Sequence, residues 1–254
     1  MQRVTLGSSG LDVSRLAIGT GTSGWGGRSN QTRLGFDRCV RLLRYAFDRG
    51  ITFWDSADQY GSHPHLREAL RQVGRERVVV TTKTTSRTPA EVEADVHRFR
   101  RELGTDYLDV VLLHCLSEPD WPRRYAECMD TLTRLRQAGL IRALGVSCHD
   151  FGAFRSAAAE PWVEVVLARI NYAGVSMDAP PEQVVPVLEA MHAAGKGVYG
   201  MKVVGAGRLV RDRRRAVRYV LALPSVDAIV LGMESEREVD EDADLVEEMA
   251  LVPA

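Results

Sequence analysis

Cysteine is scarce in this sequence, and its spacing shows no pattern of a disulfide scaffold or a zinc site. Only four of the 254 residues are cysteines, and no two of them form a C-x-x-C pair. Such usage excludes a small disulfide-stapled protein and is typical of a reducing compartment. We therefore predict unpaired thiols, no metal site and a cytoplasmic protein. None of the four is a clear nucleophile: Cys39, Cys115, Cys128 and Cys148.

Long apolar runs and an excess of one charge are also missing. No window comes near the roughly 18 apolar residues of a membrane span, and the N-terminus has no apolar signal core. The 33 Lys and Arg residues balance 34 Asp and Glu residues, for a net charge of −1. The chain therefore lacks the net positive charge that would predict binding to a nucleic acid or an anionic membrane. The local arginine-rich run at 211–215 is predicted to be the solvated start of a helix.

What the sequence does contain is a regular alternation of short apolar runs and stretches with helical spacing. Glycines such as Gly50, Gly139 and Gly195 stand where the helical stretches should end. Runs rich in Val, Ile and Leu that alternate with helices are typical of a buried parallel sheet. Eight such units in 254 residues favour an α/β fold closed into a (β/α)8 TIM barrel. The predicted strands are 16–19, 51–55, 78–83, 108–114, 143–147, 163–170, 198–202 and 228–232.

The first residues precede this alternation. Residues 4–14 alternate around a Gly-Ser-Ser-Gly turn, which predicts a small hairpin or lid. No linker or low-complexity segment interrupts the later units. We therefore predict a single domain over residues 1–254, with a β-hairpin at 1–15 and the barrel at 16–254.

Four ionisable side chains follow three neighbouring predicted strands. Asp55 ends the second strand, with Tyr60 in the loop after it, while Lys83 ends the third strand and His114 the fourth. TIM barrels carry their chemistry at the carboxyl ends of the strands, so the four groups should meet at one mouth. A neighbouring cation favours the phenolate form of a tyrosine, and Lys83 is predicted to be this cation for Tyr60. Tyr60 is the predicted general acid or base. Asp55 would hold Lys83 charged, and His114 would donate a hydrogen bond to a substrate carbonyl.

The segments around these residues resemble the aldo/keto reductase family. The matching motifs are Asp55-Ser-Ala-Asp-Gln-Tyr60-Gly61, Thr82-Lys83-Thr84, the run 103–114 and the run 139–147, and the resemblance extends over about 4–242. It implies an Asp-Tyr-Lys-His tetrad and hydride transfer between a nicotinamide cofactor and a small carbonyl or alcohol substrate. It also implies the barrel. We expect a monomer or a small homo-oligomer.

A glycine pattern after the first barrel strand suggests a different fold. Gly19 to Gly24 matches G-x-G-x-x-G, which in a Rossmann fold opens a helix and binds a dinucleotide. Here residues 25–33 look like a loop, and the second strand ends only at Asp55. We therefore interpret Thr20 and Gly21 as a loop beneath the cofactor, as the family resemblance implies.

The cofactor site implied by the resemblance departs from the family's usual residues. Cys148 stands where the family has Asn, Leu167 stands where it has Gln, and Met201-Lys202 replaces a Tyr-Ser pair. Lys202 is a candidate contact for phosphate. The full set of cofactor residues implied is Thr20, Gly21, Asp55, Ser147, Cys148, Met201, Lys202, Gly205, Gly232, Ser235, Glu238 and Asp242.

The segment after the eighth predicted strand bears on the choice of cofactor. Alignment with the family puts Gly232 and Glu238 at two positions where NADPH-preferring members carry Lys or Arg. A carboxylate repels a 2′-phosphate but can accept a hydrogen bond from a ribose hydroxyl. We therefore predict that NAD(H) is favoured over NADP(H), with the neighbouring Arg237 as the cation that would oppose this preference.

Three loop residues are predicted to wall the substrate pocket: Trp25, Trp121 and His149. Trp54 should point away from Asp55 and pack beneath a helix, because side chains alternate along a strand. The sequence stops soon after the last predicted helix, where the family often has a further segment. This predicts an open mouth, with loose selectivity or a bulky substrate.

Two alternative functions fit parts of the sequence. A nicotinamide-binding regulatory or sensor protein with little turnover would fit the altered carboxamide contacts. A metal-dependent lyase or hydrolase would leave the tyrosine and lysine without a role. Its ligands would be Asp55, His63, His65 and His114. The two histidines of this set that flank Pro64 are expected at a helix start, in surface or capping roles.

Overall fold

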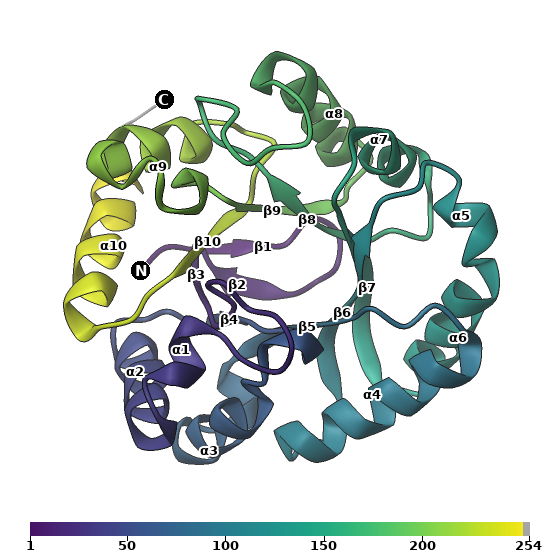
Figure 1. Ribbon diagram of the computed structural model, residues 1–254, viewed down its shortest axis with the longest axis horizontal. Helices are drawn as coiled ribbons and strands as arrows, with labels where there is room; N and C mark the ends of the chain where they lie inside the picture. Colours follow the sequence, from purple (N-terminus) through teal and green to yellow (C-terminus); the bar gives the residue numbers. More distant parts are fainter. Residues whose placement is uncertain (251–254) are drawn as a thin grey trace.

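The eight predicted strands form a closed parallel barrel. The structure is a computed structural model that describes residues 1–250, and Figure 1 views the barrel with its ring of helices. The strands pair in the order β10-β3-β4-β5-β6-β7-β8-β9, which confirms the predicted TIM barrel. The strands are β3 (Leu16–Gly19), β4 (Phe53–Asp55), β5 (Val79–Thr84), β6 (Leu108–Leu116), β7 (Ile141–Cys148), β8 (Val165–Arg169), β9 (Gly197–Met201) and β10 (Ala228–Gly232).

Helices follow the strands and cover the outside of the barrel (Figure 1). Their starts and ends carry ordinary capping chemistry: Thr88 and Asp150 accept backbone N–H bonds as N-caps, and Gly104 adopts the left-handed C-cap conformation. Among the residues described, no helix is both long and apolar enough to cross a bilayer. The α-helices are α1 (Asn30–Arg33), α2 (Phe36–Asp48), α3 (His63–Val73), α4 (Pro89–Leu103), α5 (Trp121–Arg124), α6 (Ala126–Gln137), α7 (Phe151–Ala159), α8 (Pro181–Ala193), α9 (Arg213–Leu221) and α10 (Glu236–Ala250), and the short 3-10 turns are η1 (Asp58–Tyr60), η2 (Arg75–Arg77), η3 (Gly205–Gly207) and η4 (Val210–Asp212).

Strand alternation divides the apolar side chains into two layers. On β6, Val110 and Leu112 belong to the cluster inside the barrel, whereas Val111 and Leu113 belong to the cluster beneath the helices. Trp54 lies in the helix-facing cluster, as predicted, and its indole N–H donates to the Ile51 carbonyl oxygen at 3.0 Å. The same alternation turns the inner residues at the strand ends toward the mouth of the barrel.

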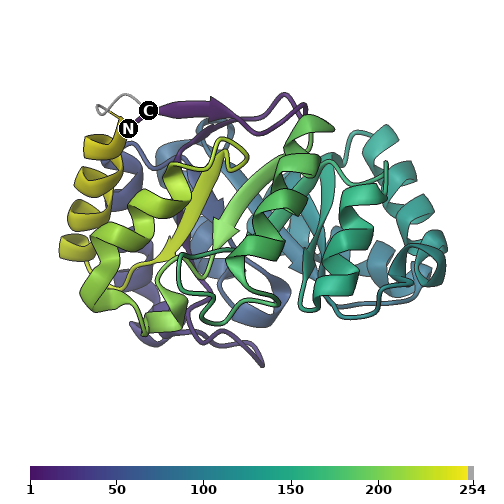
Figure 2. The same cartoon turned by 90° about the horizontal axis from the view of Figure 1, so that it is seen from above.

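The N-terminal residues form the predicted hairpin. Strands β1 (Arg3–Thr5) and β2 (Asp12–Ser14) pair antiparallel. Leu6, Leu11 and Val13 are buried in the cluster inside the barrel. Figure 2 shows the hairpin across the end of the barrel where the strands begin. It therefore plugs the amino-terminal end and is not a lid over the mouth.

Candidate active site

Asp55 and Lys83 form a buried ion pair where β4 and β5 end. The Lys83 ammonium donates to both carboxylate oxygens of Asp55 at 2.8 Å and to the Ser56 carbonyl oxygen at 2.6 Å. Burial lowers the pKa of Lys83, and the Asp55 carboxylate opposes this shift. Because an ammonium has three N–H donors, this arrangement occupies all of them.

Tyr60 lies directly over this ion pair. The Lys83 Nζ atom is 5.1 Å from the centre of the Tyr60 ring and acts on the phenol through its field. Burial raises the pKa of Tyr60, with smaller contributions from Asp55 and Cys115. Burial of the phenol therefore opposes the shift toward phenolate that Lys83 is predicted to favour. Asp55 offsets the lysine charge, and burial favours the neutral phenol.

The loop after β3 holds the Tyr60 ring from the other side. A methyl group at Gly21 would lie 2.2 Å from a ring carbon of Tyr60, and one at Gly24 would lie 2.5 Å away. Only glycine allows this close approach. Thr20 lies behind the loop, where its hydroxyl donates to the Asp55 carbonyl oxygen at 2.9 Å. The G-x-G-x-x-G motif at residues 19–24 thus forms a loop that packs against the Tyr60 phenol, and no helix begins at its last glycine.

His114 completes the group at the end of β6. Its ring stands edge-on to the Tyr60 ring, with centroids 6.1 Å apart and an interplanar angle of 85°. Burial, followed by the Lys83 charge, lowers the pKa of His114 to about 2. The imidazole is therefore neutral and carries one N–H that can donate to a carbonyl oxygen. The four residues predicted at one mouth do meet there.

Tyr199 on β9 is a further member of the site that the sequence analysis missed. Its phenol donates to Asp55 Oδ1 at 2.9 Å from a fully buried position. The alternation along β9 turns residue 199 into the barrel, where Phe53 packs against its ring at 5.1 Å. The strand pattern contained this signal, because inward positions on a barrel strand alternate.

A cavity of about 440 Å³ leads from Tyr60 toward α10. Seven predicted cofactor or catalytic residues line it, and so do Leu167, Arg213 and Glu234, which were not in the predicted set. The predicted residues in its wall are Gly21, Asp55, Tyr60, Met201, Lys202, Gly232 and Glu238. The predicted cofactor residues outside its wall are Thr20, Ser147, Cys148, Gly205, Ser235 and Asp242.

One buried hydroxyl beside this cavity fits a nicotinamide. Ser147 at the end of β7 is fully buried, and its Oγ atom has no hydrogen-bond partner within residues 1–250. Ser147 pairs in register with Leu167, which lines the cavity. A buried polar group without a partner is costly, so a polar ligand group is expected there. The carboxamide of a nicotinamide has the required donor and acceptor.

The far end of the cavity carries two carboxylates and one guanidinium. Glu238 Oε2 accepts from the Glu234 backbone N–H at 2.7 Å, and both side chains line the cavity. Arg213 lies opposite them, with its Nη1 atom 3.3 Å from Asp242 Oδ1. Arg237, the cation that would oppose a preference for NAD(H), is 84% exposed and pairs with Glu241.

Arg213 was assigned to a solvated charge run, and the structure corrects this. The run does open α9, as predicted, but its helical geometry turns residue 213 into the cavity wall. Residues 211, 214 and 215 lie on the outer surface and are exposed.

Comparisons with known proteins decide the family. The model of the aldo/keto reductase family matches residues 15–216, which carry the tetrad and most of the cavity wall. The chain belongs to the aldo/keto reductase family. Members of this family are NAD(P)-dependent oxidoreductases.

Individual relatives are distant. The chain is 30% identical over 164 residues to the aldo-keto reductase YhdN of Bacillus subtilis, covering 58% of this chain and 47% of that protein. It is 28% identical over 173 residues to the NADH-specific methylglyoxal reductase of Escherichia coli, covering 59% of this chain and 53% of that protein. The chain thus spans about half the length of these curated relatives. A solved Pseudomonas aeruginosa structure assigned to the aldo-keto reductases superposes with a TM-score of 0.82 at 26% identity, covering 98% of this chain and 95% of that one.

The three residues predicted to wall the substrate pocket of this aldo/keto reductase fold lie in different environments. His149 lies at the mouth, where its ring is 6.1 Å from that of His114, and Trp25 is 63% exposed in the loop after β3. Trp121 is fully buried, and its indole N–H donates to the Ala153 carbonyl oxygen at 3.1 Å. It cannot wall a pocket, because the short helix α5 packs it beneath α7.

His63, a predicted ligand of the metal-dependent alternative, is bound to side chains outside the tetrad. His63 begins α3, as predicted, but its side chain is buried, and its Nδ1 atom is 2.7 Å from Glu102 Oε2. Its Nε2 atom is 2.8 Å from the Thr82 hydroxyl oxygen. Both ring nitrogens are thus engaged in joining α3 to α4 and β5, which leaves neither free for a metal.

Proposed function

We propose that this protein is an oxidoreductase that transfers a hydride between a nicotinamide cofactor and a carbonyl or alcohol substrate. One observation carries the proposal. A buried Lys83–Asp55 ion pair underlies the Tyr60 phenol, which faces His114 across the mouth of the barrel. This pairing places an acid and a hydrogen-bond donor where a carbonyl oxygen can reach both.

Each residue has a separate task in this proposal. Tyr60 donates its proton to the carbonyl oxygen during reduction and accepts it from the alcohol during oxidation. Its raised pKa keeps that proton in place until substrate arrives. The Lys83 charge beneath the ring stabilises the phenolate as the proton leaves. His114 donates its N–H to the same substrate oxygen and fixes the angle of approach.

The second part of the proposal concerns the cofactor. A bound nicotinamide would supply or accept the hydride. Ser147 would satisfy its carboxamide, and Lys202, which lines the cavity, would neutralise a phosphate. Gly21 and Gly232 also line the cavity.

We further propose a preference for NAD(H). Two carboxylates, Glu234 and Glu238, line the end of the cavity away from Tyr60. Arg213, whose guanidinium lies at the same end of the cavity, is beside the Asp242 carboxylate. A 2′-phosphate would be repelled by this arrangement, whereas a ribose hydroxyl could donate to either glutamate. The name of the Escherichia coli relative describes an NADH-specific protein, which supports the proposal.

The Tyr60→Phe variant tests the function. It removes the acidic proton but keeps the ring that packs on Gly21. Turnover of the best substrate from a carbonyl and alcohol panel should fall about a hundred- to ten-thousand-fold, with an unchanged Kd for NADH. The control is Tyr45→Phe, which removes a phenol on α2 that bonds to Asp240.

Two results would contradict the proposal. Retained turnover in Tyr60→Phe would remove the tyrosine from the chemistry. Tight NADH binding by the unaltered protein with no turnover on the whole panel would favour the sensor function instead.

A further inference from the structure

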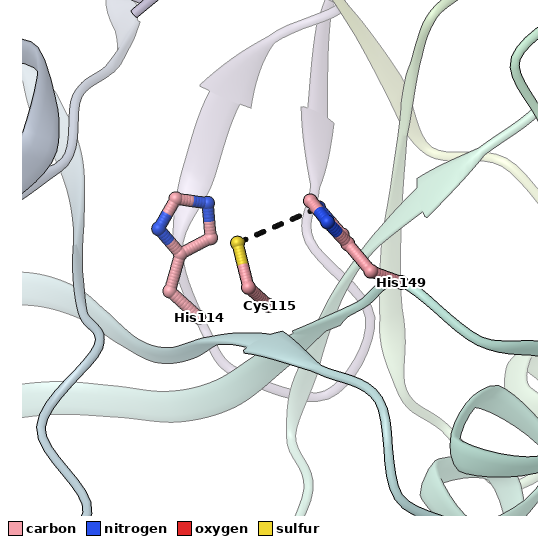
Figure 3. A group of neighbouring side chains, drawn as sticks. All are labelled: His114, Cys115 and His149. Atoms are coloured by element: carbon pink, nitrogen blue, oxygen red, sulfur yellow. Dashed lines mark hydrogen bonds between the residues drawn. The ribbon is translucent and has the colours of Figure 1, made fainter. Parts of the chain in front are cut away.

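Next to the tetrad, three potential metal ligands meet on the substrate side of the mouth. His114 and Cys115 are consecutive at the end of β6, and His149 follows β7. One ligand atom from each lies within 4.8 Å of the others. Figure 3 shows the Cys115 thiol between the two imidazoles, with its Sγ atom 3.6 Å from His149 Nε2. The cluster thus comes from two neighbouring strands with fixed backbones.

An unusual backbone turns Cys115 toward the mouth. Its φ angle is +58°, in the left-handed region that is costly for residues other than glycine. The pairing of β6 with β7 also shifts register between Leu113 and Leu116. In a regular strand, residue 115 would face the side opposite to His114. Strain of this kind persists where the surrounding structure enforces it, and it is concentrated at functional sites.

The ligand chemistry fits a thiophilic divalent ion. Imidazole nitrogen and thiolate sulfur are the usual ligands of Zn²⁺, and three protein ligands leave a fourth position for water. A neutral imidazole offers one nitrogen lone pair to a metal ion, and His114 and His149 each place such a ring beside the Cys115 sulfur. Cys115 is half-buried.

The surrounding charges set the strength of such a site. Lys83, Arg87, Arg169 and Lys202 all lower the pKa of the Cys115 thiol, although burial raises it more. Two of these cations are paired: Lys83 with Asp55, and Arg169 with Asp178 at 2.7 Å. Arg87 donates to the His114 carbonyl oxygen. Positive charge around the site repels a dication, so we expect reversible binding rather than a permanent structural ion.

We propose that His114, Cys115 and His149 bind a thiophilic divalent metal ion such as Zn²⁺, and that the ion competes with the carbonyl substrate for His114. On binding, the ion replaces the thiol proton, which is released to solvent. The competition rests on the proposed function, because it assigns His114 to the substrate oxygen. The binding itself does not.

Titration of the full chain with Co²⁺, a coloured substitute for Zn²⁺, tests the binding. A thiolate-to-cobalt charge-transfer band should appear in the near ultraviolet, saturate at one ion per chain and disappear when Zn²⁺ is added. Cys115→Ser should abolish the band. His192→Gln, which removes an exposed histidine from α8, should leave it unchanged. No band, or a band retained in Cys115→Ser, would overturn the site.

Kinetics tests the competition separately. Zn²⁺ should raise the apparent KM for the carbonyl substrate and leave kcat unchanged, and EDTA should reverse this effect. Cys115→Ser should keep its basal activity and raise the inhibition constant for Zn²⁺ at least about tenfold. Turnover that is insensitive to Zn²⁺ while Co²⁺ still binds would overturn the competition alone. Absence of all turnover would refute the proposed function, and the cobalt band would still decide the metal site.

Discussion

Tyr199 shows how a residue that touches no reacting atom can hold the site in place. Its phenol and the Lys83 ammonium both donate to Asp55 Oδ1, at 2.9 and 2.8 Å. The carboxylate is thus held from β5 and from β9, on different sides of the barrel. Hydrogen bonds to a charged group are stronger than neutral ones, so this bond should fix the direction in which Asp55 presents Lys83 to Tyr60.

Tyr199→Phe should weaken both stability and turnover. The variant keeps the ring that packs on Phe53 but removes one hydrogen bond to a buried carboxylate. We expect a loss of about 1.5–3 kcal/mol in the free energy of unfolding. We also expect kcat to fall about tenfold, with an unchanged Kd for NADH. Urea unfolding and steady-state kinetics measure these quantities. Tyr219→Phe on α9 is the matched control, and equal kinetic effects in both variants would refute the positioning role.

Glu238→Gln should change the cofactor preference. It removes a negative charge from the cavity wall but keeps an oxygen that can accept from the Glu234 backbone N–H. Affinity for NADPH should rise about tenfold, while affinity for NADH should change little. Fluorescence titration with both cofactors measures this. Glu236→Gln, at an exposed position on the same helix, is the control. NADPH binding at least tenfold tighter than NADH in the unaltered protein would contradict the proposed preference.

The residues found from sequence and those missed differ in a physical way. Asp55, Lys83 and His114 end strands whose apolar runs are easily located, so their common mouth follows from parallel strand order. Arg213 and Tyr199 depend on the direction a helix or strand turns one side chain. That direction is set by packing between segments far apart in the chain. A charge run or an apolar run in the sequence does not reveal it.

The N-terminal hairpin is an element whose contribution to folding stability can be separated from the chemistry at the mouth. Leu6, Leu11 and Val13 fill the end of the barrel where the strands begin, against inner residues such as Ala17 and Phe53. The mouth lies at the other end (Figure 2). The hairpin should therefore contribute to folding without touching the chemistry.

Leu11→Ala tests this separation. It leaves a cavity in a fully packed plug, which should cost about 2–5 kcal/mol in the free energy of unfolding. Turnover at a temperature where the variant stays folded should be unchanged. Asp12→Asn is the control, because its pair with Arg3 is exposed and should contribute less than about 1 kcal/mol. A fall in kcat for Leu11→Ala would show that the two ends of the barrel are coupled.

Element boundaries followed from sequence only where the backbone is regular. The apolar run 78–83 corresponds closely to β5 at Val79–Thr84. Strand β6 was expected to end at His114 but continues to Leu116 through a register shift. No pattern in the sequence predicts a left-handed φ angle at a cysteine. The proximity of His114, Cys115 and His149 therefore could not be predicted from the sequence, although the three residues themselves are easily identified there.

At the scale of the whole molecule, a buried carboxylate without a hydrogen bond makes stability depend on pH. Asp242 on α10 is 1% exposed, and neither carboxylate oxygen has a hydrogen-bond partner among residues 1–250. Arg213 lies 3.3 Å away without the geometry of a hydrogen bond. Burial therefore dominates and raises the pKa of Asp242 to about 7.

This shift predicts how stability depends on pH. The folded state holds the Asp242 proton more tightly than the unfolded chain, whose pKa is about 3.9. The resulting stabilisation is complete below about pH 4 and is lost as pH rises toward 7. Asp242→Asn mimics the protonated form, so above pH 7 it should be more stable than the unaltered protein by up to about 4 kcal/mol. Urea unfolding between pH 5 and 8 measures the difference.

The difference should shrink as pH falls. Asp244→Asn provides a control on the same helix, where the carboxylate is 73% exposed and should show little pH-dependent change. A gap between Asp242→Asn and the unaltered protein that is constant with pH would show that Asp242 is ionised throughout.

The way Lys83 is held has a consequence for side reactions. A buried lysine with a lowered pKa, placed beside a carbonyl compound, is the arrangement that enzymes use to form Schiff bases. Here the ammonium is fully buried beneath the Tyr60 ring, and its three protons are bound to Asp55 and to the Ser56 carbonyl. No lone pair is left to attack a carbonyl carbon. The same contacts that place the cation under the phenol would thus prevent Lys83 from forming a covalent adduct with the aldehyde or ketone substrate of the proposed reaction.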